Sequence, residues 1–382
     1  MRRTLRARDD WFKSSTKSVP KQITLLGETA KTRPGGSRSS DISVQMEMFT
    51  VQKASKLTEV VEPSVDFSIY GHVAEVGFVV RELDRVVDHW EKLGLKDIRR
   101  IGIQRIPGTY HGQNSLLTLK MAQGSVGSVR INWIEPVQGS SDFDAFLKRH
   151  GDGVHHLGYR VKSPQELERQ VEHFRSKNVA VLMQANEGHG ERRSVYLETA
   201  KRGAGLTVAL TCDPDAVTSA KSIENEEPFN TFAQYAIVAR DLRKAGSFYE
   251  SLGFGRVPVD YVDYSGVPER YYRGLQGKFT IHTNQWRWGT VPYEWIQAEE
   301  GPSVFDEYLQ KHGEGIHHLA FLVADMDRTL AAMAGKGIEV AQSGGFRYQH
   351  RRGRFAYVDT EPYGGVMIEF IWREPDNISK HE

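Results

Sequence analysis

The apolar positions of the chain follow an order of elements that recurs along its length. Apolar residues cluster in short runs over 76–80 and 235–239, which is typical of β-strands. Each run is followed by apolar residues at helical spacing, and these patterns stop at Gly94 and Gly253, where glycine commonly ends a helix. Two or three further strands come next. The pattern therefore predicts β-α-β-β-β units.

Each half of the chain contains two such units, because the order begins again after a short helix. The second unit has a strand that follows a His-His pair, then a helix, then closing strands. The residues predicted for these elements are the short helices 143–147 and 305–309, the later helices 164–177 and 326–336, and the closing strands 206–210 and 366–371. Two paired units curl eight strands into an open trough whose concave face can hold a ligand. The predicted fold class is α+β, with two tandem domains.

The two halves also repeat in sequence. Residues 144–157 return as residues 306–319, and both segments end in His-His-Leu. A repeat of this length indicates a duplicated domain rather than a solenoid unit. The predicted organisation is a disordered basic tail over 1–65, a first domain over 66–212, a linker over 213–227 and a second domain over 228–376.

The tail is predicted from its composition. Residues 1–40 hold ten Lys and Arg against three Asp and Glu, with little apolar periodicity. Such a segment cannot bury enough surface to offset the entropy lost on ordering. A targeting segment is a poorer explanation, because Asp9-Asp10 is untypical of one and no apolar signal core is present, whereas a true start at Met46 or Met48 would explain the composition equally well.

The composition of the whole chain limits the classes of partner. The 382 residues carry a formal net charge of +1, which argues against nucleic acid. A single cysteine, Cys212, excludes an internal disulfide framework and fits a reducing compartment. No run approaches the ~18 continuous apolar residues that span a bilayer. We therefore expect a soluble cytoplasmic protein with a small-molecule substrate, and with neither nucleic acid nor a membrane as partner.

Four polar residues of the second half interrupt or adjoin apolar strands: Gln234, Glu294, His318 and Glu369. A carboxylate inside an apolar strand is costly unless it is paired or bound to metal. Two carboxylates, a histidine and an amide form an oxygen and nitrogen ligand set for a divalent ion. Each residue alone would more simply lie on a solvated face or hydrogen-bond within the core. Their occurrence at equivalent places in four strands favours a metal site.

The first half provides an internal control. Its equivalent residues are Glu75, Asn132, His156 and Ala209. Ala209 has no ligand atom, and Asn132 is a weak neutral ligand. The scaffold is therefore kept without the full set, so the four residues of the second half are not needed for folding. We predict that the first domain binds no catalytic metal.

Three further residues are candidates for substrate binding. Tyr272 and Arg273 lie where a loop enters a strand, and arginine suits a carboxylate or phosphate group. Tyr357 is predicted in a strand beside Glu369. The alternatives are a turn with a solvated arginine, and a tyrosine that only packs.

At these residues the chain resembles the vicinal oxygen chelate superfamily, which includes glyoxalase I, methylmalonyl-CoA epimerase, extradiol dioxygenases and bleomycin-resistance proteins. The resemblance covers about residues 70–212 and 228–373. Its most specific motif is Gly313–Phe321, which is similar to the corresponding segment of epimerases. Two further segments, 294–297 and 365–369, also match the pattern of the family. The resemblance implies that the second histidine of the pair, His318, is the ligand. Strand alternation then directs His317 to the outer layer, and we expect structural hydrogen bonding from His317 and His155.

The ligand set is similar to that of glyoxalase I enzymes with glutamine first. This implies one divalent ion (zinc, manganese, cobalt or nickel) and a lyase or isomerase that transfers a proton next to a carbonyl through an enediolate. Glu369 is implied as the base, with Glu294 as second choice. Two alternatives stay open: an extradiol ring-cleaving dioxygenase with Fe(II), and a non-catalytic binding protein of the bleomycin-resistance type. Because the duplication supplies the pairing that single-domain relatives achieve by dimerising, we expect a monomer or a homodimer.

Overall fold

The structure is a computed structural model that describes residues 64–187, 192–213, 227–255, 262–263, 269–287, 292–348 and 351–375. The expected tail over 1–65 and linker over 213–227 lie almost entirely outside these residues. No helix of the described part is long and apolar enough to cross a membrane.

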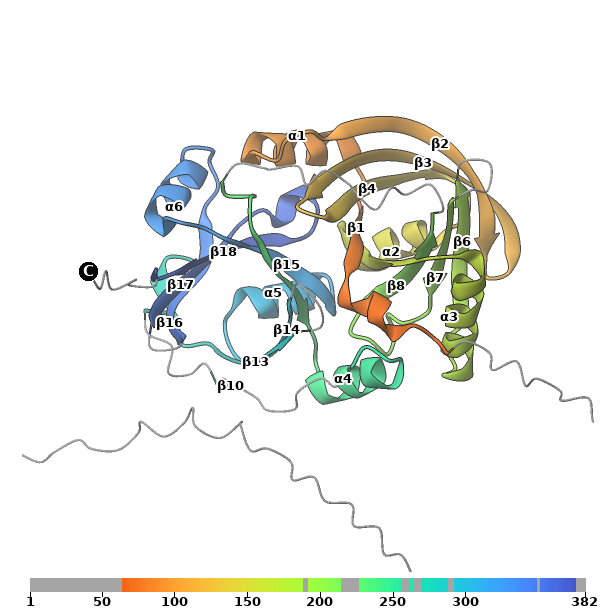
Figure 1. Cartoon of the computed structure of the whole chain (residues 1–382). Coiled ribbons are helices and arrows are strands. Elements are labelled where there is room, and N and C mark those ends of the chain that lie inside the picture. Colours follow the sequence, from red (N-terminus) through yellow and green to blue (C-terminus); the bar gives the residue numbers. More distant parts are fainter. Residues whose placement is uncertain are drawn as a thin grey trace, which may run out of the picture. The chain divides into compact units, whose positions relative to one another are not determined.

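The first half of the described chain contains two β-α-β-β-β units (Figure 1). A short 3-10 helix, η1 (Phe67–Gly71), precedes them. The first unit consists of β1 (Val73–Val79), α1 (Leu83–Leu93), β2 (Arg99–Tyr110), β3 (Gln113–Val126) and β4 (Val129–Gln138). After α2 (Asp142–His150), the second unit consists of β5 (Gly153–Val161), α3 (Pro164–Ser176), β6 (Val181–Glu187), β7 (Arg192–Leu197) and β8 (Thr207–Cys212).

The second half repeats this order, with short strands where the first half has long ones. Its first unit consists of β9 (Phe232–Val238), α4 (Leu242–Ser251), β10 (Val262–Asp263), β11 (Tyr271–Tyr272), β12 (Leu275–Gln276), β13 (Thr280–Arg287) and β14 (Pro292–Glu300). After α5 (Val304–Lys311), its second unit consists of β15 (Gly315–Leu322), α6 (Met326–Ala334), β16 (Val340–Tyr348), β17 (Arg351–Val358), the 3-10 helix η3 (Glu361–Tyr363) and β18 (Met367–Arg373).

The predicted α+β fold with paired units is confirmed by the strand pairing. In the first half, neighbouring strands run in the order β2-β3-β4-β1-β5-β8-β7-β6. The ends of the trough's two long edges also meet, because β2 pairs with β6 over Gly108–Tyr110. A Cβ at Gly108 would lie 2.0 Å from the carbonyl oxygen of Gln184, so this junction needs glycine. In the second half β11 and β16 make the equivalent junction.

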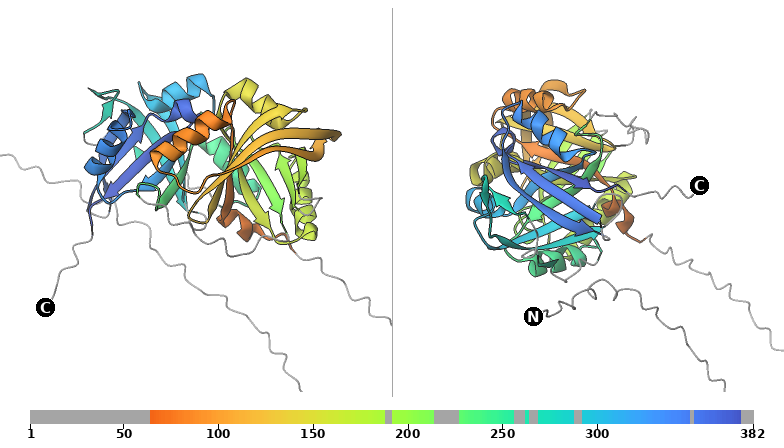
Figure 2. Two further views of the ribbon diagram at one scale, coloured as in Figure 1. Left: turned by 90° about the horizontal axis from the view of Figure 1, so that it is seen from above. Right: turned by 90° about the vertical axis from the view of Figure 1, so that its left-hand side faces the viewer.

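Helix α1 shows how the apolar pattern produces this arrangement. All five apolar residues that mark its inner face are buried: Leu83, Val86, Val87, Trp90 and Leu93. Gly94 ends the helix with φ of 120° and bonds back to its last turn, as predicted from the sequence. Helices α1, α3, α4 and α6 lie outside the curved strands (Figures 1 and 2). Helix α5 instead contributes Val304, Phe305 and Tyr308 to a separate apolar cluster inside the second trough.

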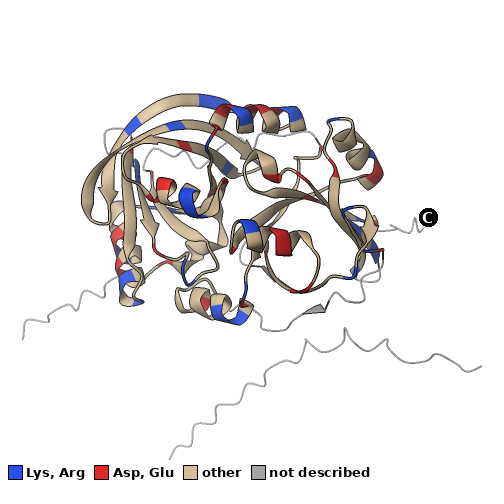
Figure 3. Ribbon diagram, turned by 180° about the vertical axis from the view of Figure 1, so that it is seen from behind, with Lys and Arg blue, Asp and Glu red and all other residues tan. Residues whose placement is uncertain are grey.

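The two halves meet at their central strands. Val154 of β5 pairs with Ile316 of β15. Beside this pair, the Nδ1 atoms of His150 and His312 each lie 2.6 Å from the carbonyl oxygen of the other histidine. The reciprocal contacts show that the junction keeps the two-fold character of the duplication. On the ribbon, basic and acidic residues are interspersed and neither sign dominates the face shown in Figure 3.

Candidate metal centre

The four polar residues predicted as ligands lie on four neighbouring strands of the second half. Gln234 is on β9, Glu294 on β14, His318 on β15 and Glu369 on β18, and the strands run in the order β14-β9-β15-β18. All four are buried, with at most 6% of the surface of any one exposed. The strand order therefore brings together residues that are far apart in the sequence.

The side chains converge on one point. The Oε2 atoms of Glu294 and Glu369 lie 3.4 and 3.2 Å from Nε2 of His318. Gln234 Nε2 lies 2.7 Å from Glu294 Oε2 and 3.0 Å from Glu369 Oε2. One ligand atom from each of Glu294, His318 and Glu369 lies within 4.8 Å of the other two, as in a metal site. In the described part of the chain, this group is the one that meets that condition.

The electrostatics of the group fit a cation. Burial raises the pKa of Glu369, although the charge of His318 opposes this shift. Burial alone would lower the pKa of His318, but Glu369 and Glu294 together raise it to about 9. Nε2 of His318 is buried. Its contacts with the two carboxylates do not have hydrogen-bond geometry, so this nitrogen has no hydrogen-bond partner. A half-turn of the Gln234 amide would present its oxygen, so all four residues could ligate a divalent ion.

A second layer of residues holds the candidate ligands in place. Thr283 on β13 donates a hydrogen bond of 3.0 Å to Oε1 of Glu294. Tyr357 on β17 lies opposite Glu369 in the strand register, and its hydrogen bond to this carboxyl works against the raised pKa. Outer hydrogen bonds of this kind fix the orientation of metal ligands. No sequence pattern indicates Thr283, whereas the strand pattern predicts Tyr357 beside Glu369.

The predicted orientation of His317 is wrong. The β15–β9 register shifts between Ile316 and His318, so a bulge interrupts the strand alternation. The ring of His317 consequently lies inside the trough, packed against Phe305, Tyr308 and Tyr357. Its Nδ1 lies 2.9 Å from Nδ1 of His318, which bears out the expected structural hydrogen bond.

Burial, followed by the charge of His318, lowers the pKa of His317 well below its ordinary value. His317 is therefore neutral near neutral pH, and its ring orients His318 without adding charge. The first half has the same register shift beside His156, and His155 there contacts His156 through Nδ1 at 3.0 Å. His155 also lies 2.9 Å from Asp142, whose place in the second half is taken by Val304.

The place in the first half that corresponds to the candidate metal site is occupied by charged side chains of the protein. The strand registers place Asn132 and Ala209 where the second half has Glu294 and Glu369. Glu75 contacts His156 Nε2 at 3.2 Å and accepts a hydrogen bond of 2.8 Å from Arg192 of β7. Burial would raise the pKa of Glu75, but His156 and Arg192 hold it at about 2. A guanidinium group thus neutralises this carboxylate, and the absence of a catalytic metal from the first domain stays a prediction.

Tyr272 and Arg273 contact a different part of the second trough. Arg273 donates to Glu307 of α5 at 2.6 Å and to Asp359 at 2.5 Å, and Tyr272 donates to Glu307. Arg273 has a φ of 47°, and His111 repeats this conformation at the equivalent turn with φ of 46°. Two carboxylates therefore compensate the guanidinium charge within the protein. Substrate binding by Tyr272, Arg273 and Tyr357 stays a prediction.

Comparison with known proteins identifies the family. The family profile described as Glyoxalase/Bleomycin resistance protein/Dioxygenase superfamily matches residues 74–196 and 233–357, well over half of the chain. The protein therefore belongs to this superfamily, as the sequence motifs implied. The uncharacterized protein YqjC of Bacillus subtilis (strain 168) is 24% identical over 155 residues, which cover 40% of this chain and 99% of that relative.

Two solved structures are similar to this chain to different extents. A triple mutant of 4-hydroxymandelate synthase from Streptomyces coelicolor has a TM-score of 0.51 at 14% identity, covering 80% of this chain and 93% of that one. A xylose isomerase-like TIM barrel/4-hydroxyphenylpyruvate dioxygenase fusion protein has a TM-score of 0.39 at 17% identity, covering 80% and 49%. The first of these similarities supports the fold.

Proposed function

We propose that the second domain binds one divalent metal ion through Gln234, Glu294, His318 and Glu369 and transfers a proton next to a carbonyl group of a small metabolite. The observation that carries the proposal is the buried convergence of Glu294, His318 and Glu369 on one point of the concave face. The two buried carboxylates carry a negative charge that a divalent cation, bound in place of the His318 proton, would balance. When bound, such an ion would act as a Lewis acid that stabilises negative charge on a carbonyl oxygen.

The protein's own residues divide the remaining work. Glu369 is the proposed base, because its raised pKa brings a carboxylate closer to the protonation equilibrium that proton transfer at neutral pH requires. Glu294 is fixed by Thr283 at 3.0 Å and by Gln234 at 2.7 Å, so it is more firmly held on the scaffold. It is the second candidate for the base. The trough around them is apolar, with Ile296, Phe305 and Met367 in one cluster, which limits access of bulk water.

The family description also includes dioxygenases, so oxygen-dependent ring cleavage with Fe(II) is the second candidate. Such oxygenases use two histidines and one carboxylate and leave three positions open for substrate and oxygen. The group here has one histidine and two carboxylates, and Gln234 lies against both carboxylates. This composition favours proton transfer. Oxygen uptake by the Fe(II)-loaded protein with a panel of catechols, measured with an oxygen electrode, would favour ring cleavage instead.

A non-catalytic binding protein is the third candidate. The first half keeps the fold with Asn132 and Ala209 in place of two candidate ligands, so a trough for sequestration would not need the charged set. Binding of a metabolite that is stoichiometric, without turnover and unaffected by a chelator would support this candidate.

The first test is the metal content of the purified protein after reconstitution with zinc, manganese, cobalt, nickel or ferrous iron. It is measured by inductively coupled plasma mass spectrometry. We expect about one ion per chain, since four ligands around one point form one site. His318→Ala should lose the ion. The matched control is His156→Ala, which removes the equivalent histidine of the first half and should keep it. Absence of bound metal in the reconstituted wild type would overturn the proposal.

A further inference from the structure

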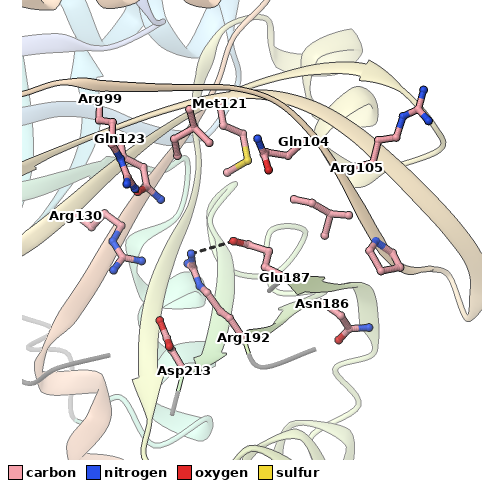
Figure 4. A pocket seen from close by; sticks show the side chains of 13 residues that line it. Arg99, Gln104, Arg105, Met121, Gln123, Arg130, Asn186, Glu187, Arg192 and Asp213 are labelled. Atoms are coloured by element: carbon pink, nitrogen blue, oxygen red, sulfur yellow. Dashed lines mark hydrogen bonds and ion pairs between the residues drawn. The ribbon is translucent and has the colours of Figure 1, made fainter. Parts of the chain in front are cut away.

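The first half of the chain contains a cavity that the metal site does not use. It has a volume of about 900 Å³ and opens between the long strands β2 and β3 on one side and β6, β7 and the end of β8 on the other. Its lining includes four arginines, Arg99, Arg105, Arg130 and Arg192, against two carboxylates, Glu187 and Asp213 (Figure 4). The charge of this lining is therefore positive, although the chain as a whole is nearly neutral.

Two of these arginines approach the same buried carboxylate. Arg192 lies 2.8 Å and Arg130 3.8 Å from Oε2 of Glu75, which is also in contact with His156. Arg192 also pairs with Glu187 at 3.2 Å (Figure 4), so Arg192 has two carboxylate partners, whereas Arg130, within the described part of the chain, has only its longer contact with Glu75. Among the described residues, the ion pair that Arg130 forms is this 3.8 Å contact with Glu75. Arg130 is thus a partly buried cation with an incomplete set of partners.

Burial lowers the pKa of Arg130, and repulsion from the neighbouring Arg192 adds to the lowering. Nε of Arg192 is also buried without a hydrogen-bond partner. Unpaired donors on adjacent guanidinium groups favour an anion with oxygen acceptors, because arginine binds carboxylate, sulfonate and phosphate groups through two parallel hydrogen bonds. Figure 4 shows both guanidinium groups directed into the same region of the cavity.

The rest of the cavity is lined by apolar side chains and by side-chain amides. Ile101, Ile106, Pro107 and Met121 line it, together with Gln104 and Gln123. Arg99 donates a hydrogen bond of 2.9 Å to the side-chain oxygen of Gln123, which holds Arg99 at the edge of the cavity. A ligand that satisfies this lining has an acidic group at one end and an apolar body of moderate size at the other.

We propose that the first domain binds an organic anion with an apolar body, held at its acidic group by Arg130 and Arg192. The site lies beside Glu75, the residue equivalent to Gln234 of the second half, and its two arginines make it a site for an anion rather than for a cation. The duplication therefore separates two ligand chemistries: a metal-assisted site in one trough and an anion site in the other. The proposal does not depend on the proposed function of the second domain.

Two dyes of almost the same shape provide the test. The probe is 8-anilinonaphthalene-1-sulfonate, an aromatic anion, and the control ligand is N-phenyl-1-naphthylamine, which lacks the sulfonate. Binding to the full chain is measured by isothermal titration calorimetry. We expect the sulfonate to bind about tenfold or more tightly than the neutral dye, since a hydrogen bond to a charged group contributes a factor of this size. Equal affinities would overturn the proposal.

Variants locate the binding. Arg130→Gln should weaken sulfonate binding about tenfold. The matched control is Arg175→Gln, which removes the same charge from the exposed face of α3, where Arg175 pairs with Glu172 at 3.5 Å. Arg99→Gln provides a second test on a more exposed residue and should weaken binding severalfold, an effect typical of a partly solvated charge. Melting curves check that each variant is folded, and equal affinities for all variants would contradict the site.

Nuclear magnetic resonance gives a readout at the cavity itself. With methyl-labelled methionine, the Met121 signal, assigned through Met121→Leu, should shift on addition of the sulfonate. A Met121 signal that does not move at saturation would overturn the proposal, because the dye would then bind elsewhere. His318→Ala should leave sulfonate binding unchanged, and Arg130→Gln should leave the metal content unchanged. Failure of the anion site and failure of the metal site are therefore distinguishable.

Discussion

His317 and His318 are neighbours in sequence whose rings lie perpendicular to each other inside the trough, with their Nδ1 atoms 2.9 Å apart. The bulge in β15 makes this contact possible, because ordinary strand alternation would place the two rings on opposite faces. The contact leaves Nε2 of His318 as the nitrogen that faces Glu294 and Glu369. His317 is thus a positioning residue for a candidate metal ligand.

Replacement of His317 by phenylalanine should weaken metal binding by about 10- to 100-fold, as loss of an outer hydrogen bond to a ligand commonly does. The aromatic ring should keep the packing against Phe305 and Tyr308. Competition with a metal indicator measures the affinity, and His155→Phe is the matched control in the first half. That control should lower thermal stability, because Asp142 loses its partner, but should leave metal affinity unchanged. Unchanged affinity in His317→Phe would contradict the positioning role.

Glu369→Gln should keep part of the metal and lose about 10²- to 10⁴-fold in turnover, the usual contribution of a general base. The amide retains one oxygen as a ligand but cannot accept the proton. Turnover is measured on substrates with an exchangeable hydrogen next to a carbonyl, drawn from ketoacids, acyl-CoA thioesters and hemithioacetals, and metal content is measured on the same samples. Glu294→Gln is the comparison. If Glu294→Gln loses turnover and Glu369→Gln keeps it, Glu294 and not Glu369 is the base.

Much of the fold could be predicted because local patterns decide it. Buried apolar spacing and the glycine after α1 set the helix, and the internal repeat supplied the equivalence of Glu75 with Gln234 that the strand registers reproduce. The orientation of His317 could not be predicted by alternation, since a bulge breaks the period of two. The glycine before each His-His pair was the available signal, because glycine in a strand favours a bulge.

The ion pair of Glu75 with Arg192 could not be predicted for a different reason. The two residues are 117 positions apart, and nothing in either strand specifies the partner. The position of Arg192 is set by the β6–β7 and β7–β8 registers, and the equivalent residue of β17 is Gly353. A comparison of the two halves along β7 and β17 would have shown that the first half alone carries an arginine there.

Arg192→Met should destabilise the protein by up to about 3–5 kcal/mol, because the buried Glu75 carboxylate loses its 2.8 Å guanidinium partner and keeps only His156 and the more distant Arg130. The double variant Glu75→Met with Arg192→Met should recover part of this loss, since the most deeply buried carboxylate is removed together with its guanidinium, while the more exposed Glu187 and Arg130 lose these partners. Unfolding by urea measures both. The exposed control Arg175→Gln should change stability by less than about 0.5 kcal/mol. Equal destabilisation in the single and double variants would show that packing, and not the charge, is responsible.

The pH dependence of stability provides a separate measure of the same carboxyl. The pKa of Glu75 is about 2 in the folded protein, against an ordinary value of 4.5. A lowered folded-state pKa stabilises the protein above pH 4.5, and this contribution is lost as the pH falls toward 2. It amounts to roughly 3 kcal/mol for a shift of this size.

Glu75→Gln should therefore be less stable than wild type at pH 7 and should lose less stability between pH 4.5 and 2. The urea midpoint at a series of pH values measures both effects. Glu361, whose pKa is also about 2 through His312 and Lys311, contributes a slope of the same sign that persists in this variant. The difference between wild type and variant isolates Glu75. Parallel curves across this range would mean that the carboxyl of Glu75 titrates alike in the folded and unfolded chain.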